Sequence, residues 1–185
     1  MTRRLFVSVD LDGLADEVAA VQDHLADASG LNHVDPRQAH VTLKFLGDTD
    51  PGRVDDLVDE LERAVADSGV EPFTASFGGL GVFPSLDYIS VVWLGVDAGS
   101  DELARLHESI EDRTTAMGFE AADHDFTPHV TLARMEHGGG KELVQEIVRE
   151  RDPSVGELAV EEIRLTESVL TDAGPMYSTV ESISL

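Results

Sequence analysis

The tetrapeptide HVTL occurs twice in the chain, at residues 40–43 and again at residues 129–132. Alternation of polar and apolar residues is typical of a strand with one face in the core, because side chains two residues apart point to the same side. Each motif therefore presents a histidine and a threonine on one face, about 6 to 7 Å apart along the strand. We expect His40 with Thr42, and His129 with Thr131, to be chemically active pairs.

Two imidazoles and two hydroxyls around one centre suit displacement at phosphorus. In that reaction the nucleophile enters opposite the leaving oxygen. A neutral imidazole can take a proton from the entering group while an imidazolium gives one to the leaving group, and the ordinary pKa of histidine allows both forms near neutral pH. The hydroxyls can donate hydrogen bonds to the non-bridging oxygens. This chemistry requires no metal ion.

The flanking sequence predicts that each motif strand belongs to a repeated series of elements. Apolar periodicity in the first half predicts a strand at 4–11, a helix at 13–28, the motif strand at 40–47, a helix at 48–69 and a strand at 73–83. The glycines of GGLGVF in the last strand favour a bulge or bend over a phosphate-binding loop. The second half repeats this order with strands at 88–96 and 129–135, helices at 100–118 and 140–150, and closing strands within 155–170 and 176–185.

The two motifs lie 129 − 40 = 89 residues apart, which is close to half of the 185-residue chain. This spacing indicates duplication of one unit rather than a solenoid of short repeats. We expect an α+β fold with two pseudo-symmetric lobes, each a mainly antiparallel sheet backed by helices. The histidine–threonine pairs would then meet in a cleft between the lobes.

Three segments, HVTLKFLG, GGLGVFPS with VVWLGV, and FTPHVTLAR, resemble the two-histidine (2H) phosphoesterases. The resemblance is specifically to the RNA 2',3'-cyclic phosphodiesterases, also called the LigT-like or 2'-5' RNA ligase family, and it runs from Leu5 to the end of the chain. It implies a bilobal LigT-like fold, a single domain over residues 1–185, and metal-independent hydrolysis of an RNA 2',3'-cyclic phosphate to a 2'-phosphate without a cofactor. Some members also join or cleave 2'-5' linkages in spliced tRNA halves.

The same resemblance implies a role for each motif residue. Formation of a 2'-phosphate means that the 3' oxygen leaves, so we expect His40 to be the proton donor and His129 the proton acceptor, although pseudo-symmetry leaves the opposite direction chemically sensible. Thr42 and Thr131 would bind the phosphate. Arg134 matches an arginine that the family places after the second motif, where it offsets phosphate charge. Strict alternation puts Arg134 opposite His129, so this role requires a bulge, a strand end or a long reach.

Other residues near the motifs leave alternatives open. Phe126 could stack on a base, as aromatic residues of single-stranded RNA readers do, or could belong to the core. His124 with Asp125 suggests a metal cluster only weakly, because no ligand spacing of a known site is present. The histidines outside the motifs have no such partner, and we expect them on the surface or in turns: His24, His33, His107, His124 and His137.

Two further functions compete with the cyclic phosphodiesterase. One is a phosphodiesterase for another small cyclic phosphate of the ADP-ribose type, because the motifs contact phosphate and not a base. The other is an RNA-end binding protein without turnover. Both histidines and both threonines are present, which favours an enzyme.

Acidic residues dominate the composition: 37 Asp and Glu face 13 Lys and Arg, for a net charge of −24. They are spread along the chain rather than gathered in one tail. Such a surface repels nucleic acid at low salt and keeps a protein soluble in concentrated electrolyte, so we expect a halophilic host. Lys44 and Lys141 are the only lysines. With Arg134 and a few other arginines, Lys44 is expected to supply the contacts to RNA.

The chain has no cysteine, which excludes disulfides, thiolate metal sites and a cysteine nucleophile and fits a reducing cytoplasm. The apolar run after the initial MTRR is too short for a signal-peptide core, and no longer run suits a membrane span. We expect a cytoplasmic monomer with tRNA processing among its possible roles. Its partner would be RNA with a 2',3'-cyclic phosphate end, or a cyclic nucleotide.

Overall fold

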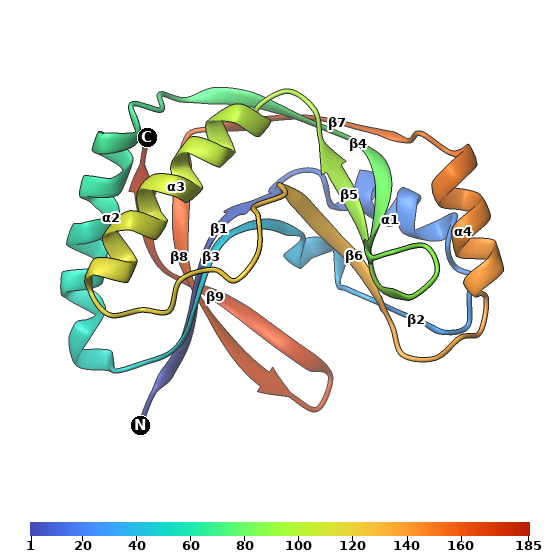
Figure 1. Ribbon diagram of the computed structural model, residues 1–185, viewed down its shortest axis with the longest axis horizontal. Coiled ribbons are helices and arrows are strands. Elements are labelled where there is room, and N and C mark those ends of the chain that lie inside the picture. Colours follow the sequence, from blue (N-terminus) through green and yellow to red (C-terminus); the bar gives the residue numbers. More distant parts are fainter.

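One sheet of nine strands runs through the molecule in the computed structural model, which describes residues 1–185 (Figure 1). The strand order is β7-β4-β5-β6-β3-β1-β8-β9, with β2 paired to β6 beside this path. The strands are β1 Arg3–Asp10, β2 Leu31–His33, β3 His40–Thr49, β4 Phe73–Pro84, β5 Ile89–Val96, β6 His129–Met135, β7 Ser154–Val160, β8 Glu162–Thr171 and β9 Gly174–Ser184. The helices are α1 Ala15–Asp23, α2 Val54–Ser68, α3 Ser100–Ala116 and α4 Lys141–Glu150.

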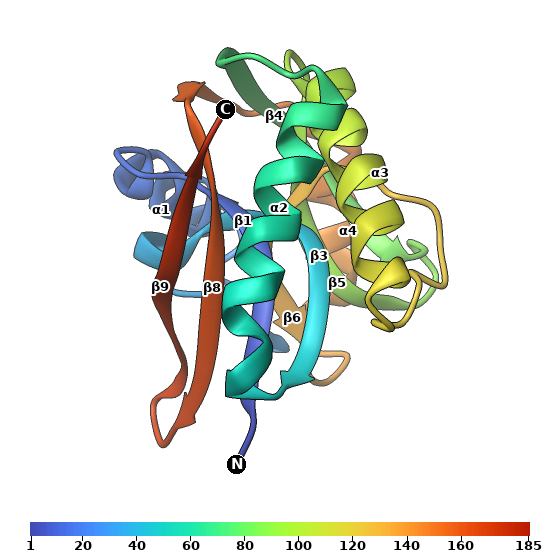
Figure 2. The same ribbon diagram turned by 90° about the vertical axis from the view of Figure 1, so that its left-hand side faces the viewer.

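The sheet is divided into two lobes, which confirms the predicted α+β fold. The first lobe holds β1, β3, β8 and β9 with α2 and α3, which lie side by side (Figure 2). The second lobe holds β2, β4, β5, β6 and β7 with α1 and α4 (Figure 1). All strand pairs are antiparallel, and the lobes meet where Val41 of β3 pairs with Val130 of β6. The two motif strands are therefore neighbours at the middle of one curled sheet.

Helices α1 and α3 each pack on the other lobe from the strand that precedes them in the chain. Helix α1 follows β1 of the first lobe but packs against β6 and β7 of the second. Helix α3 follows β5 of the second lobe but packs against β3 and α2 of the first. Each motif strand is thus covered by a helix that reaches it from the other half of the fold.

Several element boundaries differ from the prediction for local reasons. Helix α1 is shorter than the predicted 13–28, and α2 starts at Val54 because a 3-10 turn at Pro51–Arg53 follows a longer β3. Helix α2 ends at Ser68, and the next residue, Gly69, has a φ of 67°, the left-handed conformation that closes a helix. The predicted strand at 155–170 is broken after Val160, because β7 pairs with β4 whereas β8 pairs with β1.

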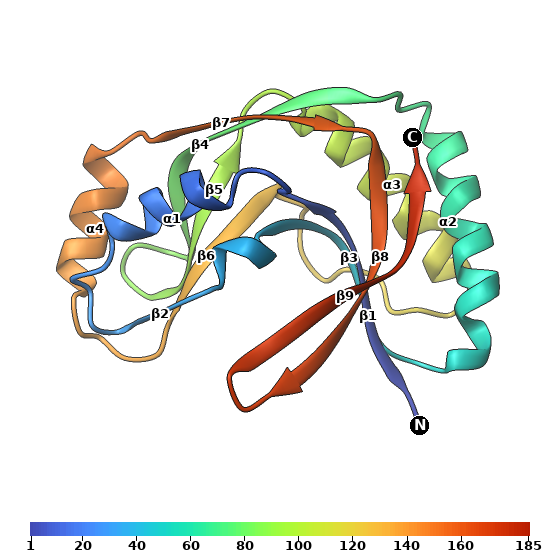
Figure 3. The same ribbon diagram turned by 180° about the vertical axis from the view of Figure 1, so that it is seen from behind.

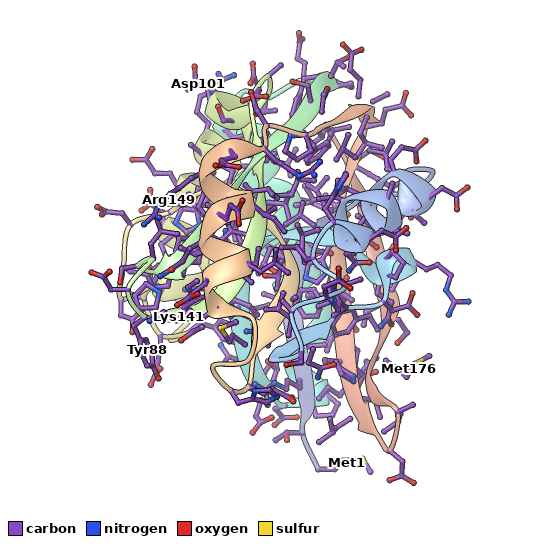
Figure 4. All side chains as sticks on the ribbon, turned by 90° about the vertical axis from the view of Figure 1, so that its right-hand side faces the viewer. Met1, Tyr88, Asp101, Lys141, Arg149 and Met176 are labelled. Carbon is purple, nitrogen blue, oxygen red and sulfur yellow. The ribbon has the colours of Figure 1, made fainter.

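The main core is a cluster of 30 buried apolar residues that includes side chains of both lobes, among them Val7, Leu43, Leu94 and Leu132. A smaller cluster of 6 lies beneath α4. The β8–β9 hairpin projects away from the body (Figure 3) and carries exposed apolar side chains at Val169, Leu170 and Met176, the last of which points outward in Figure 4. No helix combines the length and the apolar character that a membrane crossing requires.

Candidate active site

The register of the sheet brings the two motifs together. β3 and β6 pair antiparallel at Val41 and Val130, both of which are fully buried. In this register each motif histidine comes opposite the threonine of the other motif. The two histidines and two threonines are half-buried residues that alternate with the buried valines and leucines. They consequently lie together on the face of the sheet that points away from the core, as the alternation predicts.

His40 is held in one orientation by the chain that precedes it. Its Nδ1 lies 2.9 Å from the carbonyl oxygen of Gln38, and its Nε2 lies 3.0 Å from Oγ1 of Thr42. Because a carbonyl oxygen only accepts hydrogen bonds, Nδ1 of His40 must carry a hydrogen. Proton exchange with a substrate is therefore left to Nε2, next to the threonine hydroxyl.

The second motif repeats this arrangement. Nδ1 of His129 lies 2.6 Å from the carbonyl oxygen of Thr127, again two residues earlier. Nδ1 is again the donor, and Nε2 is again the nitrogen that can exchange a proton. Both motifs thus fix the same tautomer by the same backbone contact.

Burial lowers the pKa of both histidines below the ordinary value of 6.5. For His40, the hydrogen bond to Gln38 and the charge of Asp10 oppose this decrease, whereas the charge of Arg134 adds to it. For His129, the hydrogen bond to Thr127 opposes the decrease, and the positive charges of His40, His124 and Arg134 add to it. Protonation of one motif histidine therefore disfavours protonation of the second, which suits one acid and one base.

A β-bulge in β6 places Arg134 on the face of the histidines. Trp93 of β5 pairs with Thr131 and Val92 pairs with Ala133, so Leu132 is an extra residue on its strand. Leu132 and Ala133 are both fully buried, and Arg134 is exposed. The structure thus contains the bulge that the phosphate-binding role expected for Arg134 requires.

Arg134 is electrostatically close to the motif histidines and is not engaged elsewhere. Its charge acts on the pKa of both His40 and His129. It makes no ion pair in the structure, whereas several other arginines are paired with carboxylates. Its guanidinium is free to meet an anionic ligand.

A second bulge, in β3, overturns the expectation for Lys44. Ser8 of β1 pairs with Thr42 and Val7 pairs with Lys44, so Leu43 is the extra residue. Lys44 is consequently turned inward and is only 4% exposed. Its Nζ donates to the carboxylate of Glu111 and to the carbonyl of Glu120, each at 2.5 Å. Lys44 therefore cannot contact RNA.

Phe45 takes the place in the first motif that Arg134 takes in the second. It follows the bulge in the same way and is 71% exposed. At this position one strand carries an aromatic ring and the other carries a cation. The ring of Phe45 lies 6.3 Å from that of Phe6, which in turn packs against His40. Phe45 was not predicted at the site, because strict alternation would place it opposite His40.

Aromatic side chains that sequence reasoning did not identify enclose the histidines. Phe6 and Tyr177 lie 5.0 Å and 5.3 Å from the ring of His40, measured between ring centroids. Phe83 and Trp93 lie 4.9 Å and 5.9 Å from that of His129. These apolar rings exclude water, which is the physical origin of the lowered histidine pKa values.

The glycines of GGLGVF have structural roles in β4. The strand pairs irregularly with β5 between Phe77 and Leu80, as the predicted bulge requires. Gly81 makes room for the indole of Trp93, because a Cβ there would lie 2.2 Å from Cζ2 of the ring. This glycine thereby allows Trp93 to lie beside the site.

The rings of Phe126 and His107 pack against each other, and Phe126 contacts the core, which is one of the two alternatives that the sequence left open. The two rings are stacked at 4.2 Å with an interplanar angle of 6°. The face of Phe126 that His107 covers cannot stack on a base. The expectation that His107 lies at the surface or in a turn is wrong, because its side chain is only 16% exposed and Nδ1 donates to the carbonyl of Leu43 at 2.7 Å.

His124 is exposed and pairs with Asp123 at 2.6 Å rather than joining a larger cluster with Asp125. The structure holds no group of three or more His, Asp or Glu side chains arranged for a metal ion.

Comparison with known proteins assigns a family to this arrangement. The family model of the 2'-5' RNA ligase superfamily matches residues 11–171. An RNA 2',3'-cyclic phosphodiesterase of Methanothermobacter thermautotrophicus is 38% identical over the full length of both chains. Another of that name, from Archaeoglobus fulgidus, is 35% identical and covers 94% of this chain and 96% of its own.

Solved structures agree with the fold. A crystal structure of a Thermus thermophilus protein superposes with a TM-score of 0.80 at 28% identity, over 98% of this chain and 97% of that one. Escherichia coli LigT in complex with 3'-AMP superposes with a TM-score of 0.79 at 21% identity, over 100% and 99%. From the duplicated motifs, the curled sheet and these matches, we conclude that the chain belongs to the 2'-5' RNA ligase superfamily.

Proposed function

We propose that this protein is an RNA 2',3'-cyclic phosphodiesterase that opens the cyclic phosphate to a 2'-phosphate by metal-independent catalysis with His40 and His129. The observation that carries the proposal is the repeated anchoring of the two imidazoles. Each Nδ1 donates to a backbone carbonyl two residues earlier, which leaves both Nε2 atoms for proton transfer on one face. The names of the relatives with 38% and 35% identity support the same substrate.

The reaction follows from the positions of these groups. Nε2 of His129 takes a proton from water as the water oxygen forms a bond to phosphorus. The bond from phosphorus to the 3' oxygen breaks, and Nε2–H of His40 protonates that oxygen. Thr42 and Thr131 donate to the non-bridging oxygens, and Arg134 offsets their charge. The products are a 2'-phosphate and a free 3'-hydroxyl.

Charges around the two histidines support this direction of proton transfer. The carboxylate of Asp10 raises the pKa of His40, whereas every charged neighbour of His129 lowers its pKa. The carboxylate thus favours the protonated form of His40, which a proton donor requires, and the cationic neighbours of His129 favour its neutral form, which a proton acceptor requires.

Ligation of 2'-5' linkages would use the same groups in the same reaction class. A ribose hydroxyl would replace water as the nucleophile, and His129 would take its proton. The phosphate-binding groups would be unchanged, so hydrolysis and ligation are separable only by their products.

A product assay tests the proposal. Oligonucleotides and mononucleotides with a 2',3'-cyclic phosphate are incubated with the protein in EDTA, and 2'- and 3'-phosphate products are resolved by chromatography. We expect only the 2'-phosphate. A 3'-phosphate product would contradict the assignment of the leaving oxygen, and loss of turnover in EDTA would contradict the metal-independent reaction. Binding without turnover on either substrate would favour the RNA-end binding protein.

A further inference from the structure

The carbonyl group of each bulge residue accepts a hydrogen bond from a polar helix side chain. Leu43 and Leu132 are the extra residues in β3 and β6, where they turn the strand after the motif. The carbonyl of Leu43 accepts from Nδ1 of His107 at 2.7 Å, and that of Leu132 accepts from Nε2 of Gln22 at 3.0 Å. Neither helix side chain takes part in the proton transfers described above.

The side-chain amide of Gln22 donates hydrogen bonds to two segments of the chain. Its Nε2 donates to the carbonyl of Leu132 and also to the carbonyl of Val34 at 2.9 Å, which uses both of its hydrogens. The Leu132 carbonyl additionally accepts from the backbone N–H of Val34 at 3.0 Å. Gln22 is 7% exposed, so a polar group there without a partner would be costly.

His107 makes the equivalent contact in the first lobe. Its Nδ1 must carry the hydrogen because the carbonyl of Leu43 only accepts. Its Nε2 lies 3.8 Å from Oε2 of Glu111, and Glu111 also bonds Lys44, the residue that follows the bulge. The α3 helix thus holds both the bulge carbonyl and the side chain that the bulge turns inward.

The two contacts are related by the duplication of the fold. α1 begins at Ala15 and α3 at Ser100, so Gln22 and His107 are each the eighth residue of their helix. Both helices are the ones that pack on the opposite lobe. The same position of the same repeated helix therefore bonds the same bulge residue, although one is a glutamine and the other a histidine.

We propose that Gln22 and His107 are positioning residues, which hold the bulges at Leu132 and Leu43 and thereby place the side chains that follow them at the active site. Gln22 acts on Arg134, and His107 acts on Phe45. The proposal rests on the proposed function, because Arg134 is assigned there to the phosphate. Without the bulge, alternation would return Arg134 to the core face, where an unpaired cation is strongly disfavoured.

The first experiment compares Gln22→Met with Val21→Ala. Methionine keeps the volume of Gln22 and removes its donors, whereas Val21→Ala leaves a cavity in the same helix beside the same core. Both variants should unfold at a lower temperature. Only Gln22→Met should lower kcat/KM on a 2',3'-cyclic phosphate, about 10- to 100-fold, because small displacements of a positioned group have effects of that size.

A double-mutant cycle identifies the group through which Gln22 acts. If Gln22 positions Arg134, Gln22→Met should have less than a threefold effect on kcat/KM in an Arg134→Ala background, while its effect on melting temperature stays the same. Equal effects of Gln22→Met in both backgrounds, or equal activity losses in Gln22→Met and Val21→Ala, would overturn the proposal.

His107 is tested by rescue of its donor. His107→Phe retains the ring that stacks on Phe126 but cannot donate, and His107→Gln can donate to Leu43 without an imidazole. An exposed aromatic ring such as that of Phe45 can stack on a base, so its displacement should weaken binding of RNA. We therefore expect KM for an oligonucleotide to rise in His107→Phe and to be largely restored in His107→Gln, with Leu106→Ala as the control for lost stability. A KM that follows melting temperature across all three variants would contradict the positioning role.

The crystal structure of Gln22→Met separates this proposal from the proposed function. If the wild-type protein lacks turnover on every cyclic phosphate, the proposed function fails. The position of Arg134 can still be compared in the two structures. An unchanged bulge and an unchanged Arg134 in Gln22→Met would overturn the positioning role whatever the substrate is.

Discussion

At the scale of single residues, the site is built from two copies of one local arrangement. The positions of His40, Thr42, His129 and Thr131 on one face could be predicted, because strand alternation depends only on spacing. The tautomers could not be predicted, because they depend on the backbone carbonyls of Gln38 and Thr127, whose direction is set by the turn before each strand. The aromatic rings around the histidines come from other strands, which sequence spacing does not relate.

Replacement of either motif histidine should reduce the chemical step without unfolding the protein. Because a positioned acid or base contributes roughly 10²- to 10⁴-fold, we expect His40→Ala and His129→Ala each to lower kcat by about that factor. His124→Ala is the control, since His124 is exposed and bonds only Asp123. Single-turnover rates and circular dichroism of the three variants provide the measurement. A loss in His124→Ala as large as in His40→Ala would contradict the assignment.

The pH dependence should reflect the lowered pKa values of the two histidines. Activity requires one protonated and one neutral imidazole, so kcat/KM falls below the lower pKa and above the higher one. Burial moves the pKa of both histidines below 6.5, so we expect the optimum below pH 6.5 and a decrease as the pH rises through neutrality. A profile of kcat/KM from about pH 4.5 to 9 spans both limbs around the ordinary histidine pKa and tests this. An optimum in the alkaline range would exclude it.

Asp10 gives this pH prediction a matched control. Its carboxylate raises the pKa of His40, so Asp10→Asn should move the alkaline limb of the profile to lower pH. Asp10 and Asp12 both bond Arg164, at 2.8 Å and 2.5 Å, but only the charge of Asp10 acts on His40. Asp12→Asn should therefore leave the limb in place. Equal shifts in both variants would mean that Arg164, and not the charge near His40, sets the profile.

At the scale of secondary-structure elements, the two bulges decide which residues reach the site. The two motif strands were predictable from alternation, but their bulges were not, because HVTLKF and HVTLAR are equally compatible with regular strands. Alternation therefore misplaced Lys44 and Phe45 and made the role of Arg134 depend on an irregularity. The consecutive apolar residues Leu132 and Ala133 are the only local sign of a bulge, and they are compatible with a regular buried strand as well.

The buried lysine makes a clear prediction about stability. Lys44→Met removes the partner of Glu111, whose carboxylate also accepts from the backbone N–H of Ala122 at 3.2 Å. Removal of one member of a buried ion pair leaves an uncompensated charge and should lower the free energy of unfolding by about 3 kcal/mol. Denaturant unfolding followed by circular dichroism measures this. The double variant Lys44→Met with Glu111→Leu should recover most of the loss, and a double variant less stable than Lys44→Met would contradict this explanation.

At the scale of the whole molecule, the 89-residue spacing predicted two lobes but not how their helices are shared. Apolar periodicity shows that α1 and α3 bury one face, but it does not show which sheet covers that face. The exchange places α1 on β6 and α3 on β3, so each motif strand depends on a segment from the other half of the duplication. The two lobes are consequently coupled by their helices as well as by the pairing of Val41 with Val130.

The excess of acidic residues sets the electrostatic field of the whole molecule. Several of the cations that would oppose this field are paired with neighbouring carboxylates. Ion pairs engage several arginines with neighbouring carboxylates, namely Arg3, Arg37, Arg63, Arg113 and Arg164. Lys44 is buried in another pair. Six of the 13 basic residues are thus paired with carboxylates, and among the seven that make no ion pair Arg134 lies at the active site. An anionic substrate approaches a molecule that repels it at long range.

Salt should therefore increase both stability and activity. The Debye length falls from about 10 Å at 0.1 M to about 3 Å at 1 M, which screens the repulsion within the protein and between protein and RNA. In the opposite direction, one contact such as that of Arg134 weakens about fivefold over a tenfold rise in salt, from the slope of about −0.7 per phosphate contact on single strands. We expect screening to exceed this single loss, so melting temperature and kcat/KM on an oligonucleotide should rise between about 0.1 and 1 M potassium chloride.

Arg134→Ala should steepen the rise in kcat/KM, because it removes the contact that salt weakens. A steady decrease in activity with an unchanged circular dichroism spectrum would show that a basic groove dominates binding and that the halophilic interpretation is wrong.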